Sequence, residues 1–562
     1  MLMTHRNNGK RLDQLDRELA KADEGHEGLV VEEAVRLVTA CVSSQSLVPA
    51  VHRSSWNAPL QLSASFATQP LDLNASGPKR KDNSRINGQL INAESSKELL
   101  TIFNENREHF NIVNITTLLN QLGKVHRLHA TASSYDEALF REALAKCVQN
   151  TAKMDLRAMG TVLHALAKMS RRDDAGFLDA VLIRVRSSDV LTGAAPIAVS
   201  NVVWGAEKLG CRDRSFYHQI ARHVRQLNVA QRAEYSPIAL ANISMAFAKA
   251  GMSDAPGSLY ETVERVVKSR DLATFEPQHV ANILWSFASV QRFESPLFSL
   301  VEAHLESRPL HDFHGHVLGS VAMSFAKQAR GRVSKHTIFF ARLDAHLTEA
   351  VIKSLSSGTI ANLLWSFSKA KVHAAPCVER LRAEVARRGL ERCRKEEVVS
   401  IAWSLASARV PYDASPLYAL VEAQALRWRS RGDDPPVELL GVAFSLAKAG
   451  APSTSPFFAS LPAQVLDAGL QRFDDQGLSN ITWSLHATGS GTPQVYAAIA
   501  SEVGKRNWDR FRPSAVATFL LAFSLANVPL SPSALSQVPS HVQRLLSRYK
   551  VTELINVAWG LA

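Results

Sequence analysis

Hydrophobic residues return along this chain in blocks of about forty residues. The block ANILWSFASV at residues 281–290 recurs as ANLLWSFSKA at residues 361–370, and shorter versions stand at residues 400–408, 479–487 and 555–562. A fixed period of this length indicates one supersecondary unit that is stacked many times. We therefore expect the function to lie on an extended surface and not in a pocket.

The Trp of each block defines a reference column that recurs twelve times, at spacings of 36 to 44 residues. The position two residues later is apolar in every copy, and apolar residues fill much of the two positions before the column. This pattern is typical of a nearly all-round hydrophobic helix buried between two neighbours, which we name helix A. The column reads Asn120, His164, Trp204, Met245, Trp285, Met323, Trp365, Trp403, Phe444, Trp483, Phe523 and Trp559.

Proline marks the expected helix starts, because it fits the first helical turn. Eight residues before the column it stands at Pro196, Pro237, Pro277 and Pro436. A Ser-Pro or Thr-Pro pair, which caps and opens a second helix, follows the column in four copies, at Pro296, Pro416, Pro456 and Pro493. Amphipathic runs behind these pairs predict helix B. The sequence thus predicts an all-α fold, an α-solenoid of about twelve helical hairpins of roughly 40 residues over residues 98–562, with the last repeat truncated.

Residues 1–97 lie outside the repeats. Residues 1–50 carry charges of both signs, and we expect this segment to be partly helical. Residues 51–97 are of low complexity, rich in Ser, Ala, Asn and Gln, and the wider stretch 40–92 has only Asp72 and Asp82 as acids. Organellar transit peptides are poor in acids, so this segment is either a flexible linker or leader-like.

The positive charge of the chain belongs to the repeats. The formal net charge is +12, yet residues 1–100 hold twelve Lys or Arg and twelve Asp or Glu. A basic, elongated surface fits a polyanion, with nucleic acid as the first candidate. No apolar stretch reaches the roughly 18 residues of a membrane span, and we expect no membrane association.

Lysine recurs four residues after the reference column, in seven of the eleven complete copies. In a solenoid this position repeats along one edge, where a row of ammonium groups can follow a phosphate backbone. Lysine near a helix C-terminus also complements the helix dipole, and the two explanations are compatible. The candidate RNA-binding residues are Lys124, Lys168, Lys208, Lys249, Lys327, Lys369 and Lys448.

Asparagine recurs three residues before the reference column. Its side chain competes for local backbone groups and is mildly unfavourable inside a helix, so the recurrence needs a reason. One explanation is a hydrogen bond that stitches successive repeats together, and the other is contact with a base edge. The residues are Asn201, Asn242, Asn282, Asn362, Asn480 and Asn556.

Motifs that carry catalytic chemistry do not occur in this sequence. There is no P-loop, no GxSxG and no HExxH, so we expect no enzymatic activity and no small-molecule substrate. His311, His314 and His316 could ligate a metal, but no cysteine or second histidine cluster accompanies them. We expect no metal site and no cofactor.

The recurring signature xANxLWSFAKxG, followed by a second helix, resembles the octotricopeptide and heptatricopeptide repeat proteins, a group related to RAP and FAST-kinase-like proteins. It is also similar to the repeat region of the kinetoplastid RNA-editing substrate-binding complex. The resemblance covers residues 105–562. It implies an organellar RNA-binding α-solenoid, in the mitochondrial matrix or alternatively a plastid, that acts in RNA processing, stability, editing or translation. Many members end in a RAP domain, and we expect that domain to be absent from this sequence.

The expected function is therefore to hold single-stranded RNA on a basic solenoid surface, with ribonucleoprotein or ribosomal proteins as further partners. The main alternative is a protein-interaction scaffold of the HEAT or armadillo kind, which would hold a peptide or a ribosomal partner. A third is an enzyme whose catalytic domain would follow Ala562.

Overall fold

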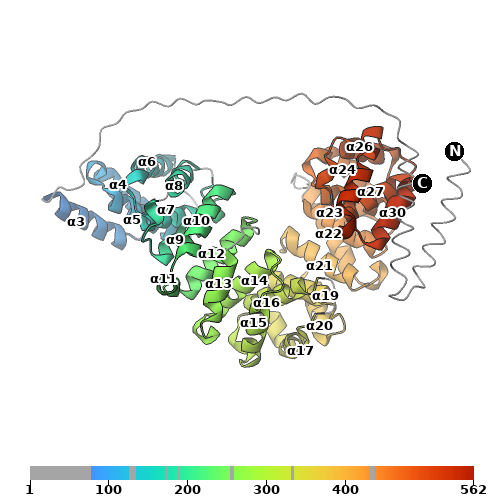
Figure 1. The fold of residues 1–562 in the computed structure, drawn as a ribbon, viewed down its shortest axis with the longest axis horizontal. Coiled ribbons are helices and arrows are strands. Elements are labelled where there is room, and N and C mark those ends of the chain that lie inside the picture. Colours follow the sequence, from blue (N-terminus) through green and yellow to red (C-terminus); the bar gives the residue numbers. More distant parts are fainter. Residues whose placement is uncertain are drawn as a thin grey trace, which may run out of the picture. The chain divides into compact units, whose positions relative to one another are not determined.

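The computed structural model describes residues 78–125, 134–172, 175–187, 189–252, 259–330, 334–430 and 437–561. All regular structure in these ranges is helical, without a strand (Figure 1), which confirms the predicted all-α repeat solenoid. No helix in the described part is long and apolar enough to cross a membrane. The predictions for residues 1–50 and for 51–77 lie outside the described residues.

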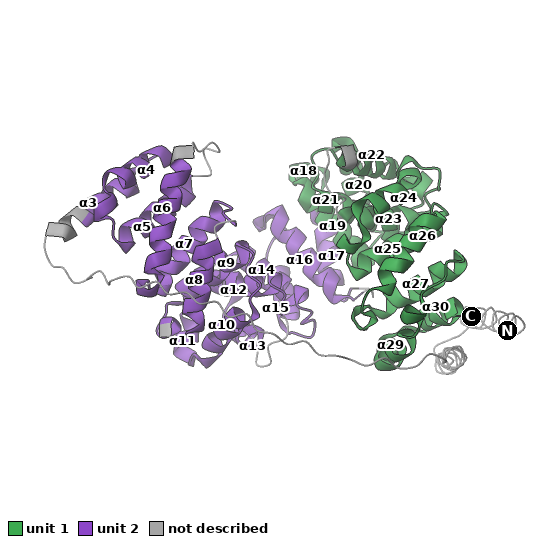
Figure 2. Ribbon diagram, turned by 90° about the horizontal axis from the view of Figure 1, so that it is seen from above, with its two compact units in different colours: residues 1–60, 347–562 green, residues 61–346 purple. Residues whose placement is uncertain are grey.

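The chain divides into two compact units (Figure 2), and each is a stack of helical hairpins. In residues 61–346, the A helices are α5 (Ile112–Val125), α7 (Leu156–Lys168), α9 (Pro196–Lys208), α12 (Pro237–Lys249), α14 (Pro277–Ser289) and α16 (Gly315–Gln328). The B helices of this unit are α4 (Ser96–Glu105), α6 (Ser134–Asn150), α8 (Ala175–Arg186), α10 (Arg214–Gln226), α13 (Leu259–Lys268), α15 (Leu297–Glu306) and α17 (Thr337–His346).

The second unit comprises residues 1–60 and 347–562, of which 347–430 and 437–561 are described. Its A helices are α19 (Ser357–Lys369), α21 (Lys395–Ser407), α23 (Val437–Lys448), α25 (Asp475–Thr488), α27 (Pro513–Leu525) and α30 (Val551–Leu561). Its B helices are α20 (Pro376–Arg388), α22 (Leu417–Ser430), α24 (Pro456–Ala468), α26 (Pro493–Gly504) and α29 (Val538–Leu545). The short helices α11 (Val229–Ala233), α18 (Glu349–Ser354) and α28 (Pro532–Leu535) lie in connections.

Within each unit, successive A helices pack side by side and more extensively than successive B helices. Small residues permit this approach: a Cβ placed on Gly205 of α9 would lie 2.7 Å from the Cβ of Leu163 in α7. In the other unit, a Cβ on Gly560 of α30 would lie 2.4 Å from the carbonyl carbon of Leu520 in α27. The A helices therefore form the close-packed layer of each stack, as their all-round hydrophobic pattern predicts.

Most A helices end on a residue in the left-handed conformation, six residues after the reference column in nearly all copies. The amide of Gly210 donates to the carbonyl of Glu207, and that of Cys211 to Ala206, which closes the last turn of α9. Glycine adopts this conformation without a steric penalty. Glycine holds it at Gly210, Gly251, Gly450 and Gly489, and other residues hold it at Ser170, Gln291, Arg330, Lys371, Arg409 and Asn527.

The predicted register of the eleventh copy is wrong by two residues. Phe523 was expected in the reference column, yet its side chain is 1% exposed, like the buried position two residues after the column in other copies. Leu521 is half-buried and lies eight residues after Pro513, as Trp285 does after Pro277. The left-handed residue Asn527 then falls six residues after Leu521. Leu521 is therefore the reference residue.

The array also begins before residue 98. Helix α3 (Pro78–Asn92) packs against α5, and Ile86 and Leu90 have no exposed surface. Asn114 of α5 donates to the carbonyl of Asn83 at 2.9 Å. Residues 78–97, which we assigned to a linker or leader-like segment, therefore belong to the helical stack.

Arginines in the B helices, or directly after them, join the repeats. Each donates to backbone carbonyls 33 to 37 residues earlier, near or within the connection from a helix B to the next helix A. Arg388 reaches the carbonyls of Leu355 at 2.6 Å and Lys353 at 3.0 Å, and it also pairs with Glu384. The arginines of this kind are Arg270, Arg342, Arg388, Arg506 and Arg544.

Candidate nucleic-acid interface

Three sequence columns share one stripe of helix A. The asparagine column lies three residues before the reference column and the lysine column four residues after it, and residues at these spacings fall on the same side of a helix. The reference residues and the column asparagines are half-buried, apart from the misassigned Phe523, while neighbouring positions are buried. We call the surface formed by these three columns the A face.

Aromatic rings of neighbouring repeats touch along the A face. Ring centroids are 5.6 Å apart for Trp365 and Trp403, and 4.9 Å apart for Phe444 and Trp483. His164 lies against Trp204 at 4.7 Å. The reference column is thus a broken row of rings whose edges remain accessible to solvent.

Lysines of the lysine column lie over these rings. The ammonium nitrogens of Lys249 and Lys327 are 5.9 Å and 5.2 Å from the ring centroid of Trp285. Lys208 lies 5.8 Å from Trp204 in its own helix. Lys369 lies 5.7 Å from the ring of Trp403 in the next repeat. Such cation–π contacts hold the ammonium groups near the aromatic row.

Three of these lysines have a lowered pKa and no carboxylate partner in the described part of the chain. Burial lowers the pKa of Lys327, and burial together with the charges of Arg409 and Lys369 lowers the pKa of Lys448. Burial, followed by the charge of Lys208, lowers the pKa of Lys249, against which Glu207 acts. In the described part of the chain, none of these three lysines forms an ion pair. The A face therefore carries ammonium groups that form no ion pair with a described carboxylate.

All seven predicted lysines lie where the sequence placed them, in the last turn of a helix A. Lys124, Lys249 and Lys448 are exposed, and the other four are half-buried. Five belong to the unit of residues 61–346, and Lys369 and Lys448 belong to the other unit. Their positions also complement the helix dipoles, so the two explanations of the column remain compatible.

The asparagine side chains bond within their own helices where the structure records a partner. Gln278 donates to Asn282 at 2.7 Å, and Gln476 donates to Asn480 at 2.9 Å. Gln278 in turn contacts Nε2 of His316 at 2.6 Å, which links α14 to α16. The arginines that do bond between repeats were not among the residues predicted to stitch them, because their partners are backbone carbonyls.

A hollow of about 390 Å³ opens on the A face of α21, α23 and α25. It forms where the asparagine column has Gly441, between Ser400 and Asn480. Gln476 also lines it, together with three carboxylates, those of Glu396, Glu438 and Asp474. The hollow offers hydrogen-bond donors and acceptors at the edge of the aromatic row.

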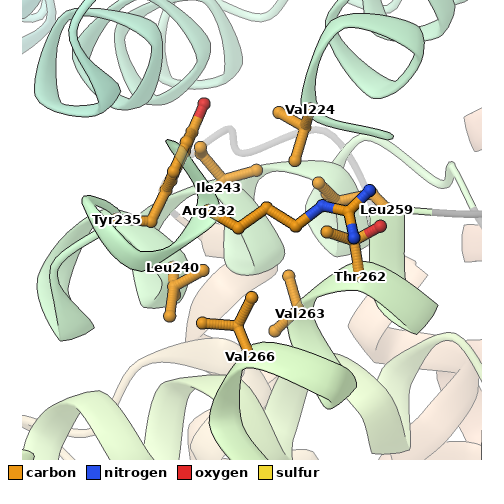
Figure 3. A pocket seen from close by; sticks show the side chains of 9 residues that line it. All are labelled: Val224, Arg232, Tyr235, Leu240, Ile243, Leu259, Thr262, Val263 and Val266. Carbon is orange, nitrogen blue, oxygen red and sulfur yellow. The ribbon is translucent and has the colours of Figure 1, made fainter. Parts of the chain in front are cut away.

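A smaller cavity lies between α12 and α13, where Tyr235 and Arg232 face apolar side chains (Figure 3). Its volume is about 10 Å³, the space of about one water molecule. The hydroxyl of Tyr235 and Nε of Arg232 have no hydrogen-bond partner among the described residues. This cavity fits a water molecule and no larger ligand.

The histidines of residues 311–316 form no metal site in the described part of the chain, where no group of three His, Cys, Asp or Glu side chains is suitably placed. The rings of His314 and His316 stack at 5.8 Å. Nε2 of His316 contacts Gln278, which in turn donates to Asn282 of the asparagine column. This ring therefore lies beside the asparagine column of the A face.

The fold and this surface define a class: an all-α helical-repeat solenoid with rows of lysines and aromatic rings on its A helices. No family model and no curated protein matches the chain. Among solved structures it is similar to yeast Rmd9p in complex with a 16-nucleotide target RNA, with 11% identity and a TM-score of 0.31 over 94% of this chain and 95% of that chain. A similarity of this size carries no argument about what this chain binds.

Proposed function

We propose that this protein is a non-enzymatic RNA-binding α-solenoid that holds single-stranded RNA along its A face. One observation carries the proposal: lysines recur on the same stripe of successive A helices, beside aromatic rings and without ion-pair partners in the case of Lys249, Lys327 and Lys448. Proteins that bind single strands combine a positively charged track with aromatic side chains. Phosphates would meet the lysines, and any sequence preference would come from polar side chains of the asparagine column.

The proposed setting is the mitochondrial matrix. The likeness of the repeat signature to organellar RNA-binding proteins supports this setting, and a plastid is the alternative. There the protein would act in RNA processing, stability, editing or translation, together with ribonucleoprotein or ribosomal proteins.

Fluorescence anisotropy of the full chain with labelled single-stranded RNA, across a salt series, tests the proposal. We expect binding that weakens steeply with salt, because each neutralised phosphate of a single strand contributes about 0.7 to the slope. Replacing Lys208, Lys249 and Lys327 with Ala should weaken binding to all sequences and reduce the slope by about 2.

A matched control changes three lysines that lie on or beside B helices. Lys268, Lys353 and Lys505 are exposed, at the ends of α13, α18 and α26, and replacing all three with Ala removes the same charge. This control should bind RNA as the wild type does. Equal losses in both variants would overturn the A face assignment. Absence of RNA binding at low salt, with a protein partner whose capture survives nuclease, would favour the HEAT- or armadillo-like scaffold.

A further inference from the structure

Several tryptophans of the aromatic row contact the ring of a neighbouring repeat, but Trp285 has different neighbours. Its neighbours in the reference column are Met245 and Met323, and no aromatic ring contacts it among the described residues. Lys249 of α12 and Lys327 of α16 lie over its ring instead, at 5.9 Å and 5.2 Å. The indole ring is half-buried. The neighbours of the Trp285 ring are therefore flexible thioether and ammonium side chains, and both kinds of side chain can move away from the ring.

We propose that Trp285 is a stacking site for one base of the bound single strand, and that Lys249 and Lys327 move from its ring to the flanking phosphates. This inference rests on the proposed function. In the free protein the two lysines lie over the ring in cation–π contact. In the complex, phosphate neutralises the ammonium groups, and the ring becomes available to a base.

Three features of the site fit this exchange. Lys249 and Lys327 come from the repeats on either side of Trp285, so a strand that crosses the ring meets one cation before it and one after it. Among the described residues, Lys327 contacts the hydroxyl of Ser289, at 3.2 Å, and the ring of Trp285. Every base has a π-face, so stacking here tolerates any sequence.

The test is a cycle that changes both the protein and the RNA. The variant is Trp285→Met in the full chain, because methionine occupies this column in both adjacent repeats and the stack accepts it. The ligands are an oligouridylate and an abasic ribose-phosphate chain of the same length. We expect Trp285→Met to weaken oligouridylate binding about tenfold, to leave binding of the abasic chain unchanged, and to leave the salt slope unchanged.

Trp285→Phe serves as the conservative variant, and it should retain most of the affinity because it keeps a ring. Thermal unfolding of each variant confirms that it folds. Equal effects of Trp285→Met on the two ligands, or no effect on either, would overturn the stacking site while leaving RNA binding in place. If the wild-type protein binds neither ligand at low salt, the proposed function fails and the stacking site fails with it.

Discussion

Basic residues on the two kinds of helix have different surroundings. The arginines of the B helices are bonded to backbone carbonyls of the preceding segment, as Arg388 is to Leu355, and Arg388 also pairs with Glu384 of its own helix. The lysines of the A helices lie over aromatic rings, as Lys369 does over Trp403. The planar guanidinium, with five donors, can bond several carbonyls at once, whereas an ammonium is a mobile point charge. The comparison indicates that arginine holds the repeats together, and the proposed RNA-binding role falls to the lysines of the A face.

The largest effect on stability should follow from Arg388→Ala. This side chain bonds three carbonyls and the carboxylate of Glu384, which is 6% exposed. Hydrogen bonds from Arg387 and Arg388 lower the pKa of Glu384 to about 2. The variant removes several part-buried hydrogen bonds between repeats, although Arg387 still bonds Glu384, and it should reduce the free energy of unfolding by about 2 kcal/mol.

Chemical denaturation measures this loss. The matched variant Lys369→Ala should lose less than about 1 kcal/mol, since it removes only a half-exposed cation–π contact. RNA affinity should follow the reverse order, with Lys369→Ala weaker than Arg388→Ala. Similar stability losses in both variants would contradict the division of roles.

Smaller and opposite effects are expected at the left-handed ends of the A helices. Arg409 and Gly450 hold equivalent positions, with φ of 57° and 87°. A side chain in this conformation costs about 1 kcal/mol, so Arg409→Gly should stabilise the protein by up to that amount and Gly450→Ala should destabilise it similarly. Because Arg409 lies close enough to Lys448 to lower its pKa, Arg409→Gly should also weaken RNA binding.

Thermal unfolding and anisotropy of the same samples check both effects. A strained residue is retained where it serves function, so a gain of stability combined with a loss of affinity is the informative result. If Arg409→Gly raises stability without changing affinity, the cation at this position has no part in binding.

Much of the fold could be predicted because the burial of helix A requires apolar residues at fixed positions in every repeat. The all-α class and the lysine positions follow from the spacing of buried and half-buried residues, of which Phe287 and Trp285 are examples. The eleventh copy was misaligned because Leu521 and Phe523 are both apolar. Their difference lies in exposure, which a residue type alone does not specify.

The stitching arginines could not be identified by that pattern, because a backbone carbonyl has no sequence signal. A weaker signal exists once the register is corrected: Arg388, Arg506 and Arg544 all stand 23 residues after their reference residues. Arg270 and Arg342 stand 25 and 19 residues after theirs, since the connections differ in length. The position of Lys327 over Trp285 likewise depends on how far two helices approach, which only the packed structure specifies.

Lowering the pH should have the smallest effect of all, and it should reduce stability without reducing RNA affinity. His541 of helix α29 is fully buried; its Nε2 lies 3.0 Å from the carbonyl of Phe511, and its Nδ1 lies 2.8 Å from the hydroxyl of Tyr549. Burial lowers its pKa below the ordinary value of 6.5. The folded state therefore resists protonation more than the unfolded state does, and stability is lost as the pH falls below about 6.5.

Between about pH 7.5 and pH 6 we expect a small fall in the melting temperature, while the lysines of the A face stay charged and RNA affinity holds. Replacing His541 with Gln, which cannot be protonated, should reduce this pH dependence, and the other histidines whose pKa burial lowers, such as His336, should account for the rest. Replacing His218 of α10, which is exposed, with Gln is the matched control. If RNA affinity and stability fall together over this range, RNA binding by the A face depends on the packing of the B helices. The contrast between lysine and arginine roles then does not hold.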